Sequence, residues 1–324
     1  MVFPVIHSTL DPRALEQELT SRYALSQPLR CQLMSRANND FYEVTAGTDR
    51  YALRVAKADF RSREAYTFEA AYVHHIHAKG CRVPGPVPAK DGSLFFEVEA
   101  PEGVRTITLM RWLDGTTFTE ALSVQDAREI GRSLAELHLA GADFKSDAAR
   151  TISASAMLDE RMPHLLGMLK ADPEHHDFYV DATAAVQSAY AEMEKANLRR
   201  GPVHGDYQFA NVMRTKTGNL AALDFDTCGI GCLAEDLFTF VWRSDMEIRN
   251  EAVNDAFISG YEEVRPLSDT ERDHLALFRV ARDLVMSSTF AILINRVGPV
   301  PGFDGDFAPF TALARTHLAD AGLA

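Results

Sequence analysis

The chain has 324 residues, of which 46% are hydrophobic and 24% are charged, and its formal net charge at pH 7 is −13. This length and composition are typical of a soluble globular protein with two domains or one large two-lobed unit. The acidic balance argues against nucleic acid or an anionic membrane as the main partner, because both attract clustered lysine and arginine. The sequence shows no signal peptide and no run of about 18 or more apolar residues, so we expect a cytoplasmic protein.

The first part of the chain predicts a region rich in strands. Alternating segments on either side of Gly47-Thr48-Asp49 predict a β-hairpin, because a glycine-containing turn joins two runs with strand periodicity. The predicted elements are a helix over residues 11–20, a hairpin within 32–57, a helix over 63–79, and strands over 93–100 and 104–113. We assign them to an N-terminal domain over residues 1–110.

The remainder, residues 111–324, predicts a larger and mainly helical domain. Helical patterns dominate residues 123–139, 151–198 and the stretch after 226, and a strand–loop–strand cluster interrupts them at 202–226. The sequence therefore predicts an α+β fold with two lobes, and ligands commonly bind between lobes of this kind.

The densest group of chemically active side chains lies within residues 202–226. His204-Gly205-Asp206 predicts a turn that exposes one carboxylate, and Asn211 follows five residues later. A hairpin through residues 216–219 would return Asp224 to the vicinity of both. Magnesium prefers oxygen ligands, and phosphoryl transfer needs the metal together with a carboxylate that accepts the proton of the attacking hydroxyl. The segment therefore indicates a magnesium-dependent phosphoryl-transfer centre.

The spacing of this segment also resembles a known family. HGDxxxxN (204–211) followed by DxD (224–226) resembles the aminoglycoside phosphotransferase and choline kinase superfamily, whose members are relatives of the protein kinases. LDFDTCGIGCLAEDL (223–237) more narrowly resembles the branch that includes stress-response kinases, type II homoserine kinases and hydroxylysine kinases. The resemblance implies a bilobal protein-kinase-like fold, with a β-rich N-terminal lobe and a helical C-terminal lobe. It also implies ATP and Mg²⁺ as cofactors and a hydroxyl group as the acceptor.

The resemblance assigns roles to individual residues of the C-terminal domain. It makes Asp206 the catalytic base, and Asn211 and Asp224 ligands of Mg²⁺. Two roles stay open for Asp226, which would either make a second metal contact or cap the following turn. Asp236 would hold the backbone of the catalytic loop through hydrogen bonds.

In the N-terminal domain the resemblance implies a strand cation that holds the ATP phosphates, paired with a helix carboxylate. Alternation along the strand sends Ala52 and Arg54 to one face, so Ala52 would lie over the adenine and Arg54 would take the place usually given to lysine. Lys57 is the alternative cation, although alternation points it to the opposite face. The partner of the cation would be Glu69, on the helix over 63–79.

Two further segments complete the expected nucleotide site. The loop over residues 35–40, with Asn38 and Asn39, would cover the phosphates with backbone amides. The segment that contains Met110 and Trp112 resembles the family's interlobe hinge, whose backbone would bind the edge of the adenine, although Arg111 stands where an acidic residue is more common.

The acceptor stays open between a small metabolite and an aminoglycoside-like antibiotic. A serine/threonine protein kinase of the stress-response type is an alternative function, and a non-catalytic nucleotide-binding regulator, prompted by Arg54, is another. We find no activation segment with an APE-like end after Asp226, which favours small molecules. We expect a monomer or a homodimer.

Two further groups of residues suggest metal sites, but we interpret them otherwise. His74, His75 and His77 do not all share one helical face, so we expect surface or packing histidines. Cys228 and Cys232 lack a second pair of ligands at zinc spacing, so we expect a structural role for both.

Overall fold

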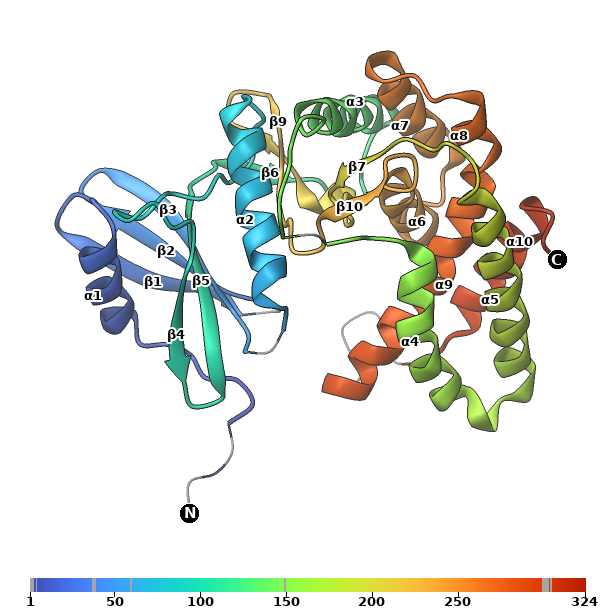
Figure 1. Ribbon diagram of the computed structural model, residues 1–324, viewed down its shortest axis with the longest axis horizontal. Coiled ribbons are helices and arrows are strands. Elements are labelled where there is room, and N and C mark those ends of the chain that lie inside the picture. The colour runs from blue at the N-terminus through green and yellow to red at the C-terminus, as the bar shows by residue number, and fades with distance from the viewer. Residues whose placement is uncertain are drawn as a thin grey trace. The chain divides into compact units, whose positions relative to one another are not determined.

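The computed structural model describes residues 3, 5–36, 39–58, 60–148, 150–298, 303 and 305–324, and the chain forms two compact units (Figure 1). Unit 1 comprises Met1–Thr117, Ala140–Arg150 and Asn211–Thr227. Unit 2 comprises Phe118–Leu139, Thr151–Ala210 and Cys228–Ala324. Each unit is thus built from segments that are not consecutive in the sequence.

The largest sheet belongs to unit 1 and has five antiparallel strands in the order β1-β2-β3-β5-β4. Its strands are β1 (Leu29–Arg36), β2 (Asn39–Ala46), β3 (Asp49–Ala56), β4 (Phe96–Ala100) and β5 (Gly103–Arg111). The hairpin predicted within 32–57 is confirmed as β2 and β3. Its turn holds Gly47 at φ 61°, in the left-handed region that glycine adopts most readily.

Helix α1 (Pro12–Arg22) lies against this sheet (Figure 1) and confirms the first predicted helix. Asp11 caps it by accepting the N–H of Arg13, and Pro12 occupies the first turn, where its missing N–H costs nothing. The buried Leu15 and Leu19 of α1 share one apolar core with the strands, including Leu53 of β3. This core fixes the strand that carries Arg54.

The predicted phosphate-covering loop over residues 35–40 is shorter than expected. Strand β1 continues to Arg36 and β2 starts at Asn39, so Asn39 belongs to a strand. The next residue, Asp40, is fully buried and its carboxylate pairs with Arg105 and His7, which holds the start of β2 in the sheet. Asn38, also predicted to line the nucleotide site, lies outside the described residues.

Helix α2 (Arg63–Ala78) confirms the predicted helix over 63–79. The side chain of Ser62 accepts the N–H of Ala65 and so caps its start, and Gly80 follows its end at φ 95°. Glu69 is one of the residues that α2 buries.

The predicted hairpin after residue 211 is also present in unit 1. Strands β8 (Val212–Thr215) and β9 (Leu220–Ala222) pair with each other, and β6 (Gly115–Thr117) pairs with β8. The N–H of Leu223 donates to the backbone oxygen of Asn211 at 2.8 Å. The hairpin therefore brings Asn211, just before β8, close to Asp224, just after β9.

Unit 2 is mainly helical, although residues 140–150 and 211–227, which the sequence analysis placed in the C-terminal domain, belong to unit 1. Its helices are α3 (Val124–Ala140), α4 (Ala154–Met168), α5 (Pro173–Met193), α6 (Leu237–Glu247), α7 (Glu251–Val264), α8 (Asp269–Asp273), α9 (Leu275–Val297) and α10 (Ala308–Asp320). Helix α9 packs against α4, α5, α6 and α10. Two short strands, β7 (Arg200–Val203) and β10 (Gly229–Cys232), pair with each other in antiparallel fashion, and β7 leads directly into the His204-Gly205-Asp206 turn.

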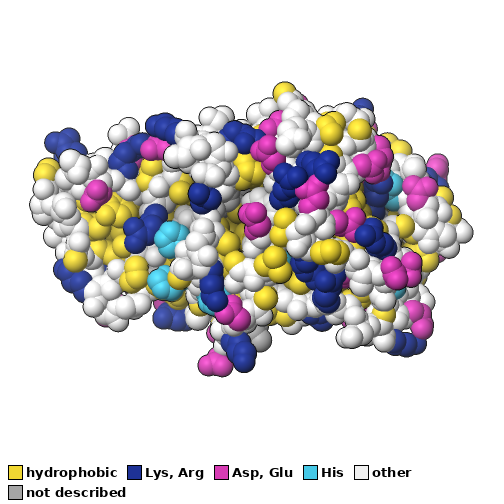
Figure 2. Space-filling view, turned by 90° about the horizontal axis from the view of Figure 1, so that it is seen from above, with side chains coloured by type: hydrophobic (Ala, Val, Ile, Leu, Met, Phe, Trp, Pro, Cys, Tyr) yellow, Lys and Arg dark blue, Asp and Glu magenta, His cyan; other side chains and the backbone are white. Residues whose placement is uncertain are grey.

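In the described part of the chain, none of the helices is both long and apolar enough to cross a membrane. Basic and acidic side chains are interspersed over the face that Figure 2 shows.

Candidate active site

A cavity of about 440 Å³ lies within unit 1. It gathers residues that the sequence analysis assigned to nucleotide or metal binding, namely Ala52, Arg54, Glu69, Met110, Trp112, Asn211 and Asp224. These residues come from β3, α2, β5, the segment after β5 and the β8–β9 hairpin, so only the fold brings them together. The volume is in the range of small-molecule sites.

Part of the cavity lining is apolar. Ala52 pairs with Met110 across β3 and β5, and Val73, Met213 and Phe225 add further apolar walls. A flat aromatic base buries well against such side chains, which is the arrangement expected for an adenine site.

Trp112, which also lines the cavity, is held in place by two neighbours. Its Nε1 donates to Oδ1 of Asp114 at 3.0 Å, and the guanidinium of Arg50 stacks 4.0 Å from the centre of its ring. Both contacts restrict the rotation of the indole, so the wall that Trp112 supplies is formed before a ligand binds.

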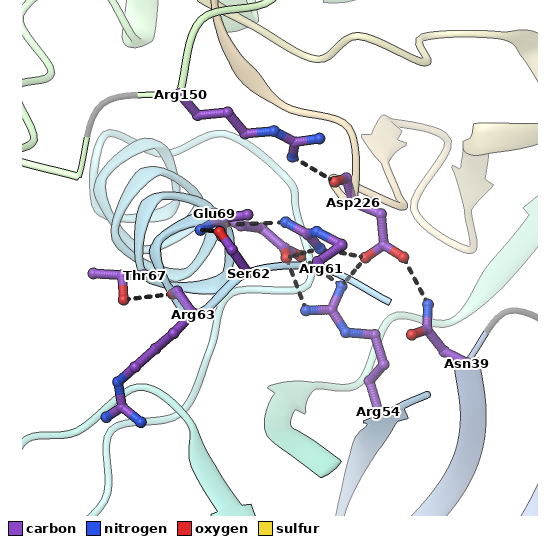
Figure 3. Close-up of polar contacts among 10 residues, drawn as sticks. Asn39, Arg54, Arg61, Ser62, Arg63, Thr67, Glu69, Arg150 and Asp226 are labelled. Atoms are coloured by element: carbon purple, nitrogen blue, oxygen red, sulfur yellow. Dashed lines mark hydrogen bonds and ion pairs between the residues drawn. The ribbon is translucent and has the colours of Figure 1, made fainter. Parts of the chain in front are cut away.

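The lining also includes charged side chains. Nη1 of Arg54 donates to Oε1 of Glu69 at 2.6 Å, and Nη2 donates to Oε2 at 3.0 Å (Figure 3). Both side chains are only 6% exposed, and the two parallel hydrogen bonds fix the guanidinium in the plane of the carboxylate. Arg54 is therefore the buried cation that faces this cavity, while Lys57 is half-buried just beyond the end of β3.

Arg54 and Glu69 belong to a larger set of charges, which we call the four-ion cluster: Arg54, Glu69, Arg61 and Asp226 (Figure 3). Nη1 of Arg61 donates to Oε2 of Glu69 at 2.6 Å and to Oδ1 of Asp226 at 3.0 Å. Nη1 of Arg54 also donates to Oδ1 of Asp226, at 2.5 Å. Sequence reasoning missed Arg61, because it lies in the irregular segment before α2, where no periodicity predicts the direction of a side chain.

The charges of the cluster shift the pKa values of Glu69 and Arg54. Burial alone would raise the pKa of Glu69, but the guanidiniums of Arg54 and Arg61 outweigh it and lower the pKa to about 2. Burial alone would lower the pKa of Arg54, and the carboxylates of Glu69 and Asp226 raise it above its usual range. Both shifts favour the charged forms of Glu69 and Arg54 at neutral pH.

Two more residues fix Asp226. Nδ2 of Asn39, at the start of β2, donates to Oδ2 of Asp226 at 2.7 Å, and Nη1 of Arg150 donates to its backbone oxygen at 2.8 Å (Figure 3). Asn39 is therefore tied to Asp226 by its side chain in this structure, a contact that the sequence did not predict.

Asn211 and Asp224 offer oxygen donors to the cavity of unit 1. Asp224 has φ 60°, a left-handed conformation that non-glycine residues rarely adopt and that recurs at functional sites. No group of three or more His, Cys, Asp or Glu side chains able to hold a metal ion is found among the described residues. One carboxylate and one amide still suit Mg²⁺, because it takes many of its ligands from phosphates and water.

The predicted catalytic turn lies in unit 2. Gly205 has φ 76°, which a tight turn requires, and His204 is fully buried. The side chain of Asp206 is 35% exposed, and its Oδ1 lies 3.3 Å from Nη2 of Arg282 on α9. The turn therefore presents a carboxylate to solvent, as the sequence analysis expected, and its histidine packs inside.

Asp236 holds the backbone of this turn through hydrogen bonds, as predicted. Its Oδ2 accepts the N–H of His204 at 2.7 Å, and its Oδ1 accepts the N–H of Gly205 at 2.8 Å. Burial would raise the pKa of Asp236, but the hydrogen bond and charge of His138 lower it. The anionic form, which accepts both backbone hydrogen bonds, is therefore the stable one.

A buried chain of hydrogen bonds supports Asp236. Nε2 of His138 lies 3.1 Å from Oδ2 of Asp236, and its Nδ1 lies 2.8 Å from the hydroxyl of Tyr261. Nη1 of Arg265 donates to that hydroxyl at 2.8 Å. Sequence reasoning missed His138 and Tyr261, because each lies on the buried face of a helix and gives no motif.

The clustered histidines and the paired cysteines show no metal site in the described residues. His75 lies 2.9 Å from Asp143, and the imidazole of His77 packs against Gly85. Cys228 and Cys232 are buried free thiols.

Comparison with known proteins agrees with this geometry. Residues 31–274 match the model of the family described as "Phosphotransferase enzyme family". An uncharacterized protein of Deinococcus radiodurans is 31% identical over 288 residues, which cover 87% of this chain and 82% of the relative. A homoserine kinase of Xanthobacter autotrophicus is 26% identical over 240 residues, covering 72% of this chain and 70% of the kinase.

The fold also resembles that of a solved protein. The structure of a microcompartment-associated aminopropanol kinase matches with a TM-score of 0.75 and 21% sequence identity, covering 96% of this chain and 99% of the kinase. The likeness confirms the predicted protein-kinase-like α+β fold.

Proposed function

Because this chain belongs to the phosphotransferase enzyme family, we propose that it uses ATP and Mg²⁺ to phosphorylate the hydroxyl group of a small amino alcohol. As a member of that family it is a small-molecule phosphotransferase, and its kinase relatives support ATP as the donor. The amino-alcohol acceptor rests on two similar proteins, a homoserine kinase and an aminopropanol kinase.

The observation that carries the proposal is the composition of the cavity in unit 1. Its apolar lining, which includes Ala52 and Met110, suits a base, and the charged Arg54 suits phosphates. Asn211 and Asp224 would hold Mg²⁺ beside them. When bound, the metal would supply positive charge to the β- and γ-phosphates.

The chain's own residues would perform the remaining steps. Arg54, fixed by Glu69, would donate hydrogen bonds to phosphate oxygens and keep the nucleotide in one orientation. The carboxylate of Asp206 would orient the acceptor hydroxyl and accept its proton as the oxygen bonds to the γ-phosphorus. Asp236 keeps the Asp206 turn in a single conformation, so little reorganisation is needed during the reaction.

The experiment is a phosphoryl-transfer assay with γ-labelled ATP and Mg²⁺ on three sets of acceptors: amino alcohols such as aminopropanol and homoserine, aminoglycosides, and simple alcohols without an amine. We expect label to appear on at least one amino alcohol with saturation kinetics. Transfer only to aminoglycosides would contradict the acceptor class. Label found only on protein would contradict the small-molecule acceptor, and label released only as inorganic phosphate, with none on any acceptor, would contradict the proposal as a whole.

A further inference from the structure

The four-ion cluster in unit 1 contains more charge than a phosphate-binding cation and its partner need. Arg54 and Glu69 by themselves form a neutral, doubly hydrogen-bonded pair. The cluster adds one further cation, Arg61, and one further anion, Asp226, and both side chains are largely buried, at 7% and 14% exposed. Burying extra charge costs free energy, so the additional pair needs a reason beyond holding Arg54.

The cluster as a whole is balanced, with two guanidiniums and two carboxylates. Oδ1 of Asp226 accepts from both guanidiniums, at 2.5 Å from Arg54 and 3.0 Å from Arg61. While Asp226 is in place, the cluster presents no net positive charge to a nucleotide. If Asp226 left Arg54, the remaining Arg54, Arg61 and Glu69 would carry a net charge of +1 and attract a phosphate.

Asp226 and Asp224 face different surroundings, although one residue separates them. Asp224 lines the cavity. The carboxylate of Asp226 is turned into the cluster, where N–H donors from Asn39, Arg54 and Arg61 point at its oxygens (Figure 3). Of the two aspartates, Asp226 therefore sits where a phosphate oxygen would be bound by Arg54.

We propose that Asp226 is a positioning residue that occupies the phosphate-binding N–H of Arg54 in the empty site and is displaced from it by the nucleotide. This inference rests on the proposed function. Nη1 of Arg54 already donates to Glu69 and Asp226 together, so an incoming phosphate oxygen replaces one anionic acceptor by another on the same atom. Because the same Oδ1 of Asp226 accepts from both guanidiniums, the nucleotide displaces it from Arg61 as well, and Arg61 then supplies the net charge that the phosphate meets.

The presence of arginine instead of lysine at position 54 fits this role. A guanidinium has several N–H groups in a rigid plane and can contact two carboxylates at once, whereas an ammonium is a point charge. Arg54 uses this geometry to hold both Glu69 and Asp226. The role also differs from the metal contact and the turn cap considered for Asp226 from the sequence.

The experiment measures ADP binding by isothermal titration calorimetry, once in EDTA and once in Mg²⁺. The variants are Asp226→Asn, Arg61→Gln and Arg61→Lys. Arg63→Gln and Glu97→Gln are matched controls, because this pair contacts outside the cluster and the Arg63 side chain is 65% exposed. Arg63 also points away from the cluster in Figure 3.

We expect Asp226→Asn to tighten metal-free ADP binding by about three- to tenfold, because the competing anion is gone. Arg61→Gln should weaken metal-free binding by a similar factor, Arg61→Lys should restore most of it, and both controls should match the wild type. A merely structural role for Asp226 would not tighten binding.

Metal-free affinity that is unchanged or weaker in Asp226→Asn would overturn the inference. The same variant losing only the gain in affinity that Mg²⁺ confers would identify Asp226 as a metal ligand instead. If Asp226→Asn alone does not fold, Asp226→Asn/Arg61→Gln keeps the charges balanced, and it must bind metal-free ADP more tightly than Arg61→Gln. A wild type that binds no ADP in either buffer would overturn the proposed function as well.

Discussion

Nη2 of Arg282, on helix α9, lies 3.3 Å from Oδ1 of Asp206, and Nη1 lies 3.5 Å from the backbone oxygen of Gly205. Asp236 accepts the N–H groups of His204 and Gly205 in the same turn, so the turn is held by Asp236 through its N–H groups and by Arg282 through its oxygens. Nothing in the HGDxxxxN motif points to an arginine 76 residues further along the chain.

Arg282→Met should lower kcat by about ten- to hundredfold, because Asp206 loses the group that orients it. The KM for ATP should stay within about twofold, since the proposed nucleotide cavity lies in unit 1 and Arg282 belongs to unit 2. Steady-state kinetics check both numbers, with Arg296→Met, an exposed arginine on the same helix, as the control. An unchanged kcat would show that Arg282 does not orient Asp206 for the reaction.

Glu69 makes the stability of unit 1 sensitive to acid. Its pKa is about 2 in the folded chain and near 4.5 when unperturbed, so its contribution is fully present above pH 4.5 and is lost as the pH falls toward 2. Glu69→Gln should lower the free energy of unfolding at pH 7 by about 3–5 kcal/mol, because two buried guanidiniums lose a charge partner.

Urea unfolding at several pH values tests this prediction, with Glu64→Gln, an exposed carboxylate on the same helix, as the control. The difference between wild type and Glu69→Gln should shrink as the pH falls from 4.5 toward 2. A difference that stays constant over this range would show that Glu69 stabilises the fold by packing alone.

Glu235 should give the stability of unit 2 the opposite pH dependence. Its Oε1 accepts the N–H of Ala154 at 2.9 Å, and burial raises its pKa from 4.5 to about 7 against the opposing effects of that hydrogen bond and of Arg282 and Arg200. The neighbouring Asp236 raises the pKa further. The folded chain therefore binds a proton that the unfolded chain releases, so stability is lost as the pH rises from 4.5 through 7.

Glu235→Gln keeps the acceptor oxygen and removes the charge. At pH 8 the free energy of unfolding of the variant should be about 1–3 kcal/mol higher than that of the wild type, and at pH 4 the two values should be equal. Thermal unfolding across this range measures the effect, and Glu247→Gln on α6 serves as a control for charge alone. A Gln variant that is less stable at pH 8 would contradict this assignment.

The sequence predicted the elements better than the connections between distant residues. The α2 helix, the β2–β3 hairpin and the β8–β9 hairpin follow from local signals, such as the helical pattern over 63–79 and the turns at Gly47 and over 216–219. Such signals are short-range rules, and they apply before any tertiary contact is known. The pairing of Arg54 with Glu69 is instead an implication of the family resemblance, and the two side chains are hydrogen-bonded in the structure.

The parts of the site that the sequence missed depend on long-range packing. Arg61, His138 and Arg282 act through partners that lie far away in the chain, such as Asp226, Asp236 and Asp206. No periodicity encodes such pairs, because they form only when separate elements fold together. The predicted loop over 35–40 is too long for the same reason, because Asp40 is held in β2 by Arg105, which lies 65 residues away in the chain.

The most direct test of the proposed chemistry is Asp206→Asn, assayed with the acceptor that the wild type phosphorylates best. The variant keeps the size of the side chain and removes the base, so we expect kcat to fall by about two orders of magnitude or more. The affinity for MgATP should stay within about threefold of the wild type, because the proposed nucleotide cavity lies in unit 1. Turnover at the wild-type rate would contradict the assignment of Asp206 as the catalytic base.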